Sequence, residues 1–538
     1  MPDNEPEAPE PGGSHPADSA AAAPSRRPHG GHRQPAPNKW WTLTAVCLGT
    51  FMLLLDITIV NVALPDIQSS LHASFSDLQW VVDAYALTLA ALLLTAGSLA
   101  DMYGRQKLYV IGLTVFSLAS LLCGLATSSL MLQLSRGLQG VGGSIMFSVS
   151  LALLAEAFRG KDRGIAFGAW GTITGLAVAI GPLLGGVLTS GLSWRWIFFV
   201  NLPIGVIAVV ITLLKVADSR HPAARRPDWP GFVLFTAGLS SLVYALIQSS
   251  HDSFSDPVVI GCLAGAVALI AAFVLLELRT RQPMFDLSLF RKPTFTGGLV
   301  AAFGLSGSLL SLLLYLVLYL QDVLGFSALG AGVRLLLISG GILVMSTVSG
   351  RLSSRMPVRF LIGPGLLLVG GGLLWMRGLN ASSEWTHLIP GMIMSGAGLG
   401  LVNPPLASTA VGVVQPANAG MASGINSTFR QIGIATGIAL LGTLFSGKVK
   451  SYVSDHIDAI PGLRGRGSQL STAVQSGTVT QTLGSLPARV RGPVKNLTAA
   501  AFTSGLNEIL LVGALIALGA GVVSFATIRT KDLVQPPS

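Results

Sequence analysis

Long hydrophobic blocks, separated by polar gaps that are mostly short, follow one another from residue 41 to residue 528. Each block holds 18 to 27 residues, and a helix needs roughly 20 apolar residues to cross a hydrocarbon core. The pattern therefore predicts an all-α membrane protein with fourteen transmembrane helices. Their expected positions are 41–66, 78–100, 109–127, 130–154, 164–189, 194–215, 231–249, 257–277, 295–320, 330–350, 360–377, 387–409, 424–446 and 502–528.

Composition agrees with this pattern. Only 11% of the 538 residues are charged and 51% are hydrophobic, whereas about 25% of a soluble domain is charged. The first block begins at Trp40 and has no small-residue cleavage pattern behind it, so we expect a retained span rather than a signal peptide. Cys47, Cys123 and Cys262 lie inside hydrophobic blocks, which predicts buried thiols and no disulfide framework.

The net charge of +10 reports topology rather than nucleic-acid binding. If the N-terminus is cytoplasmic, 22 of the 34 Lys and Arg residues fall in inner gaps and tails. The short outer gaps then hold only Arg195 and Arg377. Because positive residues concentrate on the cytoplasmic side, we expect a multi-pass protein of the cytoplasmic membrane with both termini inside and no nucleic-acid partner.

A weak repeat divides the chain. Gly97–Asp101 follows the second predicted span, and the similar stretch Gly350–Ser354 follows the tenth. Duplicated bundles are typical of transporters, whose sites lie between the repeats. The predicted parts are a disordered cytoplasmic tail (1–38), a six-helix bundle (39–216), a two-span central insert (217–293) and a second six-helix bundle (294–538). The last part includes an outer gap, 447–501, which we interpret as either a flexible loop or a cap over the outer mouth.

Charged residues inside the spans are rare and therefore informative, since charge within a bilayer is costly and usually functional. Asp56, Asp83 and Arg136 lie in the outer halves of spans 1, 2 and 4, within reach of one another if these spans are neighbours. One stripe of span 4 is polar or small, at Gln133, Arg136, Gln139, Gly140 and Gly143. An acid beside a buried arginine can be a paired carboxylate or a protonated acid. We therefore predict proton coupling by these three residues; a purely structural pair of Asp56 and Arg136 is the alternative.

Span 5 is rich in glycine, and small residues allow helices in a membrane to pack closely. Its glycines at positions 164, 168, 171 and 175 precede a Gly-Pro-Leu-Leu-Gly-Gly step at 181–186. We interpret this span as tightly packed and as a hinge and seal between the bundles, with a bend at Pro182.

The first inner gap places Gly97, Asp101, Gly104 and Arg105 in a short turn. Asp101 is expected to cap a helix or to pair with a basic residue across the bundle interface, as a gate latch; a bare topology signal is the alternative. Arg430 and Glu508 are secondary candidates that could also snorkel to a surface.

No phosphate-binding loop, metal-ligand cluster or catalytic set stands out in the sequence. The expectation is therefore a protein that is not an enzyme and has no cofactor and no metal site.

The motifs together resemble the major facilitator superfamily, in particular its fourteen-span drug:proton antiporter branch, over roughly residues 40–530. The resemblance rests on stretches in the first six spans: 55–65 in span 1, 79–85 in span 2, the 97–107 gap, the basic motif 134–140, the antiporter motif with Gly175, Gly181, Pro182, Gly185 and Gly186, and 194–203 in span 6. It implies two six-helix bundles plus two extra central spans. It also implies a monomer that exports a small hydrophobic drug or antibiotic in exchange for protons.

The chain departs from the family pattern in places. Met102 stands where the loop motif usually has Arg, and the second copy of that motif has Ser354 and Pro357 in place of its acid and its glycine. The second bundle has no deep acid apart from Glu508, which favours neutral or anionic amphiphiles over dications. Resemblance to self-resistance exporters suggests an aromatic polyketide-type antibiotic as one substrate class. A proton-coupled symporter importing a small solute, or a non-transporting sensor, stays as the alternative.

Overall fold

The computed structural model describes residues 38–218, 228–251, 254–280, 285–460, 467–475, 479 and 487–532, and its regular elements are all helices. The predicted tail 1–38 thus lies outside the described residues except for Asn38. The first part of the chain forms α1 (Lys39–Leu71), α2 (Phe75–Tyr103), α3 (Arg105–Gly124), α4 (Ser129–Ala157), α5 (Gly160–Gly191), the short α6 (Trp196–Phe199) and α7 (Asn201–Lys215). Two long helices follow, α8 (Trp229–His251) and α9 (Pro257–Arg279).

The last part of the chain begins with a helix that changes its winding twice. α10 (Pro293–Leu305) and α11 (Ser311–Leu318) are each followed by a five-residue π-helical turn, a feature that is frequent at functional sites. The remaining α-helices in the described residues are α12 (Ala328–Leu352), α13 (Arg359–Trp375), α14 (Ile389–Gly412), α15 (Ala419–His456), the short α16 (Gly467–Gln475) and α18 (Ala488–Thr527).

Among the described residues, eleven helices are long and apolar enough to cross a membrane, and twelve if the bent α5 counts as one span. α13 is a shorter apolar helix of 17 residues, and α14 contains Pro404 and Pro405. The all-α fold is confirmed. Fourteen spans are compatible with these helices and stay a prediction.

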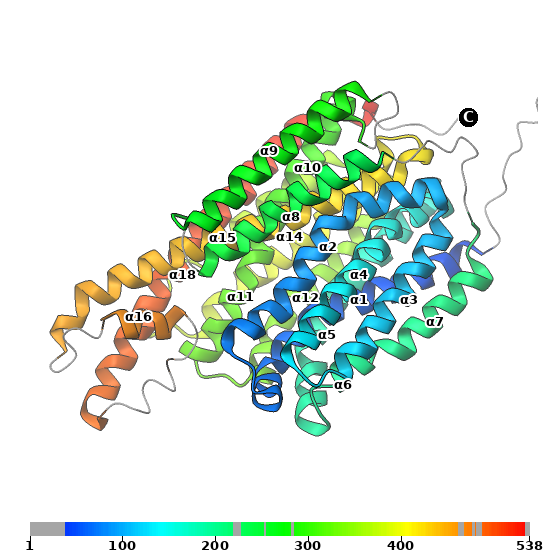
Figure 1. Cartoon of the computed structure of the whole chain (residues 1–538). Helices are drawn as coiled ribbons and strands as arrows, with labels where there is room; N and C mark the ends of the chain where they lie inside the picture. Colours follow the sequence, from blue (N-terminus) through cyan, green and yellow to red (C-terminus); the bar gives the residue numbers. More distant parts are fainter. Residues whose placement is uncertain are drawn as a thin grey trace, which may run out of the picture.

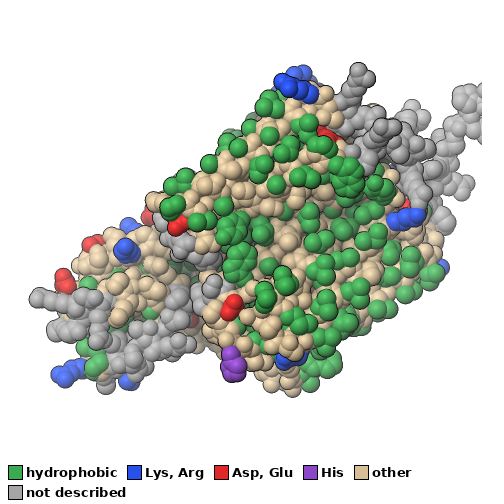
Figure 2. Space-filling view, viewed as in Figure 1, with side chains coloured by type: hydrophobic (Ala, Val, Ile, Leu, Met, Phe, Trp, Pro, Cys, Tyr) green, Lys and Arg blue, Asp and Glu red, His purple; other side chains and the backbone are tan. Residues whose placement is uncertain are grey.

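Helix contacts define how the chain is assembled (Figure 1). In the first part, α4 packs against α2 and α3, and α1 packs against α5 and α7. In the last part, α14 packs against α12 and α13, and α18 packs against α13 and α15. The most extensive contacts between the two parts are those of α2 with α15 and of α5 with α12, while α8 of the α8–α9 pair lies beside α2 and α15. Hydrophobic side chains cover the flank of the bundle, and most of the visible charged ones lie toward its ends (Figure 2).

Local sequence explains where the helices next to the site begin and end. The Ser74 hydroxyl accepts a hydrogen bond from the Asp77 backbone N–H, and the Asp77 carboxylate accepts one from the Ser74 N–H, which is a capping box. Gly104 ends α2 with φ +107°, a backbone conformation that glycine adopts without steric cost. The turn between α2 and α3 therefore depends on Gly104.

The structure differs from two expectations. α15 and α18 contain 38 and 40 residues and extend beyond the predicted spans 424–446 and 502–528, and α16 packs against both. The described parts of 447–501 thus include helix. The prediction missed this because a search for apolar blocks overlooks polar residues that continue a helix. Cys123 is buried as predicted, whereas Cys47 and Cys262 are only partly buried. Both lie on helix faces that the protein interior does not cover completely.

Candidate functional site

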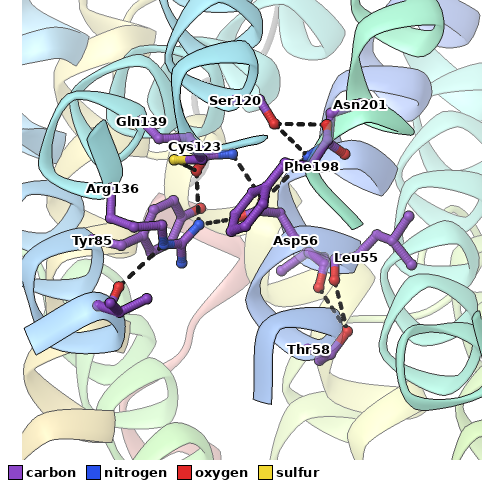
Figure 3. Close-up of polar contacts among 12 residues, drawn as sticks. Leu55, Asp56, Thr58, Tyr85, Ser120, Cys123, Arg136, Gln139, Phe198 and Asn201 are labelled. Atoms are coloured by element: carbon purple, nitrogen blue, oxygen red, sulfur yellow. Dashed lines mark hydrogen bonds and ion pairs between the residues drawn. The ribbon is translucent and has the colours of Figure 1, made fainter. Parts of the chain in front are cut away.

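Asp56 of α1 and Arg136 of α4 form an ion pair in the interior of the first bundle. The Arg136 Nη1 atom lies 2.5 Å from Asp56 Oδ2, and the two residues are only 1% and 0% exposed. Gln139, one turn farther along α4, and Asn201, at the start of α7, donate to Asp56 Oδ1 at 2.8 and 3.1 Å. The carboxylate therefore receives donors from three side chains (Figure 3).

The arginine is equally enclosed. Its Nε donates to the Val81 carbonyl of α2 at 3.1 Å, and its Nη1 also donates to Gln139 Oε1 at 2.8 Å. The Tyr85 ring lies 4.2 Å from the guanidinium carbon, and the Phe198 ring lies 6.0 Å from it. Cation–π contacts of this kind strengthen when the site is desolvated. Arg136 thus ties α2 and α4 to the acid on α1.

A second ring of polar side chains supports the pair. Asn201 Nδ2 also donates to Ser120 Oγ at 3.0 Å, and this hydroxyl donates to the Phe198 carbonyl at 2.9 Å. Neither Asn201 nor Ser120 is among the site residues predicted from the sequence, although Asn201 falls in the 194–203 stretch that carries the family resemblance. Each is one small polar residue among apolar ones, which by itself is a weak signal of a site. Only the packing of α7 against α1 and α3 brings Asn201 to Asp56 and Ser120 to Asn201.

Such a site can hold a negative charge within the membrane. Removing one partner of a buried ion pair costs about 3–5 kcal/mol, because the other charge is left uncompensated. Protonation of Asp56 has a related effect, since it removes the charge that balances Arg136. The geometry therefore links the protonation of one carboxyl group to the contacts among α1, α2, α4 and α7.

Asp83 lies on another face of α2 from Val81 and Tyr85, which contact Arg136. It is half-buried on α2, two residues from both Val81 and Tyr85. Because successive helix residues turn by about 100°, its side chain points away from the face that contacts Arg136. The same side of α2 carries Trp80, whose ring packs against Tyr244 of α8 at 5.9 Å. Asp83 therefore lies on the side of α2 that faces α8.

The predicted latch residues meet the second bundle. The Asp101 carboxylate accepts hydrogen bonds from the backbone N–H groups of Gly420 and Met421 at 3.0 and 2.9 Å, and from Arg105 at 2.8 Å. Arg105 also pairs with Glu156 of α4 at 2.8 Å. Asp101 thus caps the start of α15 from the other bundle, and Glu156 is a partner that the sequence analysis missed.

Contacts of Arg105 and Gly97 extend this junction. Arg105 Nη2 donates to the Pro416 carbonyl at 2.5 Å. A Cβ atom on Gly97 would overlap the backbone carbonyl of Gly420. The bundles are therefore closed against each other at the end where α2 finishes and α15 begins.

The glycines of α5 make contacts of two kinds. Gly164 and Gly168 pack against the backbone of Gly350 in α12, and Gly175 packs against Ile342 of the same helix. Farther along, Gly181 and Gly185 pack against Thr58 and Ile59 of α1, whereas Gly186 has open space beside it. The backbone of Pro182 continues α5, while its side chain is not among the described parts of the structure. One helix thus touches both the opposite bundle and the segment that carries Asp56.

The two secondary candidates differ from each other. Arg430 is 9% exposed and donates to Asn403 Oδ1 of α14 at 2.6 Å, so it does not snorkel to a surface. Glu508 is half-buried on α18. Its neighbour Asn507 accepts hydrogen bonds from the Gly378 and Leu379 N–H groups at 2.9 and 3.1 Å, which is a structural contact after α13.

Comparison with known proteins agrees with this architecture. The "Multidrug resistance protein Stp" of Mycobacterium tuberculosis is 37% identical over 422 residues, which cover 78% of each chain. The "Tetracenomycin C resistance and export protein" of Streptomyces glaucescens is 33% identical over 502 residues, 93% of each chain. The human organic anion transporter MFSD10 has a similar fold, with a TM-score of 0.60 at 14% identity over 91% of this chain and 100% of its own. The sequence model of the Major Facilitator Superfamily matches residues 46–438, and the chain belongs to this family.

Proposed function

We propose that the protein is a proton-coupled antiporter that exports a hydrophobic drug or antibiotic across the cytoplasmic membrane and so gives resistance. The observation that carries this proposal is the Asp56–Arg136 pair, fully buried in the first bundle. Relatives whose names describe multidrug resistance and tetracenomycin C export support the direction and the substrate class. On the same ground we propose an aromatic polyketide-type antibiotic as one substrate class.

In this mechanism Asp56 alternates between a carboxylate paired with Arg136 and a protonated acid. Protonation removes the ion pair, and the donors on Gln139 and Asn201 lose a charged acceptor. The helices that meet at this acid then favour a different arrangement, which is how a proton can shift a two-state transporter. A membrane potential of 100 mV supplies about 2.3 kcal/mol for each charge moved.

The junction at Asp101 is proposed as the gate that closes the cytoplasmic side. Both ends of the described chain lie at this end of the bundle in Figure 1, and we place both termini in the cytoplasm. Gly97, Gly104 and Arg105 shape the gate, and the glycines of α5 serve as hinge and seal. Asp83 is proposed as an accessory proton-coupling residue on the face toward α8.

We further propose a six-plus-two-plus-six organisation, with bundles at 39–216 and 294–538 around the insert 217–293. The described parts of 447–501 form part of an outer cap in this proposal. The protein works as a monomer in the bilayer, without a cofactor or metal, and is energised by the proton gradient. It is a transporter and not an enzyme.

The test is transport by Asp56→Asn in proteoliposomes with an imposed pH gradient. A control is Asp66→Asn, since Asp66 is exposed near the end of the same helix. We expect loss of gradient-driven drug accumulation with Asp56→Asn, full activity with Asp66→Asn, and retained drug binding by both. Undiminished accumulation by Asp56→Asn would remove Asp56 from the coupling mechanism. Accumulation in the opposite direction would favour a symporter.

A further inference from the structure

A second buried cluster surrounds Arg430, on α15 in the other bundle. The guanidinium is 9% exposed, and its only hydrogen bond among the described residues goes from Nη2 to the neutral amide of Asn403. Its Nε is buried without a partner there. A buried cation is costly unless it is paired, so this arginine has donors available and a charge that the described protein does not balance.

Asn426 lies one helical turn before Arg430 and has the same character. It is 1% exposed, and neither its amide nitrogen nor its amide oxygen has a partner among the described residues. Asn426 lines a small cavity together with Thr409 of α14 and Gly298 of α10, and the Thr409 hydroxyl is also unpartnered there. Polar groups from α14 and α15 therefore converge on one cavity, which Asn426 lines one helical turn from Arg430.

Comparison with the first bundle shows what is unusual. Arg136 has a carboxylate partner, a carbonyl acceptor and an aromatic ring. No described carboxylate contacts Arg430, although burial is similar. A native buried polar group is normally satisfied, whereas Arg430, Asn426 and Thr409 each have a buried polar atom without a partner among the described residues. The cluster thus fits a ligand that supplies acceptors and negative charge.

The position of the cluster suits a transported molecule. The Ser423 hydroxyl, two turns before Arg430 on α15, donates to the Ser148 carbonyl of α4 at 2.5 Å. Residues seven apart share a helix face, so Arg430 lies on the side of α15 that faces the first bundle. Sites between the two halves are where transporters of this architecture hold their substrates.

We propose that Arg430, with Asn426 and Asn403, binds an anionic oxygen of the exported molecule, such as a carboxylate or an ionised phenol or enol. This inference rests on the proposed export function and adds the substrate class. The planar guanidinium can donate two parallel hydrogen bonds to such a group, and the Asn426 amide can donate a third. Proton coupling at Asp56 and substrate binding at Arg430 are thereby divided between the two bundles.

The experiment measures equilibrium binding of two probes of one shape, 1-naphthoate and the neutral 1-naphthamide. The full-length purified protein is titrated in detergent micelles at pH 7.5 by isothermal calorimetry. We expect wild type to bind the anion at least about tenfold more tightly than the amide, as one charge-assisted bond of about 1.5–3 kcal/mol implies. Arg430→Gln should abolish this preference by weakening naphthoate binding about tenfold, with naphthamide binding unchanged within about twofold.

Two further variants separate binding from general structure. Arg430→Lys keeps the charge without the planar fork and should retain part of the preference. Arg351→Gln removes an exposed arginine on α12 and should change nothing. Any of three results would overturn the proposal. Wild type could bind both probes with equal affinity, or it could show no naphthoate binding up to millimolar concentration. The third is that Arg430→Gln weakens the binding of both probes equally. The assay uses no proton gradient, so failure of coupling at Asp56 leaves its result intact.

Discussion

Gly97 of α2 and Gly420 of α15 meet backbone against backbone, although 323 positions separate them in the chain. Each glycine lies so close to the carbonyl of the other that a Cβ atom on either would overlap it. The closed end of the molecule therefore depends on the absence of two side chains. It is fastened by Asp101, which accepts hydrogen bonds from the backbone of Gly420 and Met421.

Gly97→Val should open this end, because overpacking a close contact costs about 1–3 kcal/mol, enough to shift a two-state equilibrium by roughly 5- to 150-fold. The distance across this end is measured between spin labels on two cysteines that replace Lys107 and Arg359, both exposed. The labelled protein lacks the three native cysteines. We expect a larger population of long distances with Gly97→Val. Gly340→Val, which has open space beside it, should leave the distances unchanged; an identical shift in both variants would contradict the steric explanation.

Asp101→Asn tests the charged part of the same junction. The substitution removes the ion pair with Arg105 and weakens the bonds to the α15 backbone, each worth about 1.5–3 kcal/mol when one partner is charged. We expect faster labelling of a cysteine at Ser98, which is 7% exposed, by a membrane-impermeant maleimide in inside-out vesicles. Asp455→Asn, on the exposed far part of α15, serves as control. Unchanged labelling in Asp101→Asn would show that the glycine contact alone closes this end.

Two glycines of the same α5 motif should behave differently. A methyl group on Gly181 would overlap Thr58 of α1, two residues from Asp56, whereas one on Gly186 meets nothing within 4 Å. Gly181→Ala should destabilise the protein by about 1–3 kcal/mol and reduce drug export, while Gly186→Ala should do neither. Thermal unfolding in micelles and a resistance assay check both variants. Equal tolerance at the two positions would mean that α5 yields to accommodate the methyl group.

Asn201→Ala tests the support of the ion pair. The amide donates to both Asp56 and Ser120, and its loss should lower the unfolding free energy by about 1.5–3 kcal/mol, because one acceptor is charged. Val210→Ala, a partly exposed position on α7, removes a similar number of atoms without a polar contact and should change stability far less. Denaturation followed by tryptophan fluorescence compares them. A larger loss with Val210→Ala would contradict a polar role for Asn201.

The sequence predicts most of this fold because membrane helices carry a strong hydrophobic signal. It also places the deep charges, since an aspartate within an apolar block is rare, and the structure brings Asp56 to Arg136. Which face of α2 meets α4 is decided by packing, so the orientation of Asp83 was not predictable. The parts of α15 after residue 446 and of α18 before residue 502 are too polar for a hydrophobic search to find.

The neutral polar residues that hydrogen-bond to the buried charges, or lie beside them, were also not predictable from the sequence. Asn201, Ser120, Asn403 and Asn426 each resemble an ordinary polar residue in a span. Their role becomes visible only when the packing of neighbouring helices places them beside a charged group. Arg430 shows the same dependence, because its burial instead of snorkelling is set by α14, which supplies Asn403.

The length of α15 has a mechanical consequence. Its 38 residues run without an internal proline from the junction with α2 to the far end of the molecule, about 57 Å at 1.5 Å per residue. If α15 tilted as one rod about Gly420, its tip would move by about 1 Å for every degree of tilt. A small tilt at the closed end would then displace the opposite end by several ångströms, as a lever arm does.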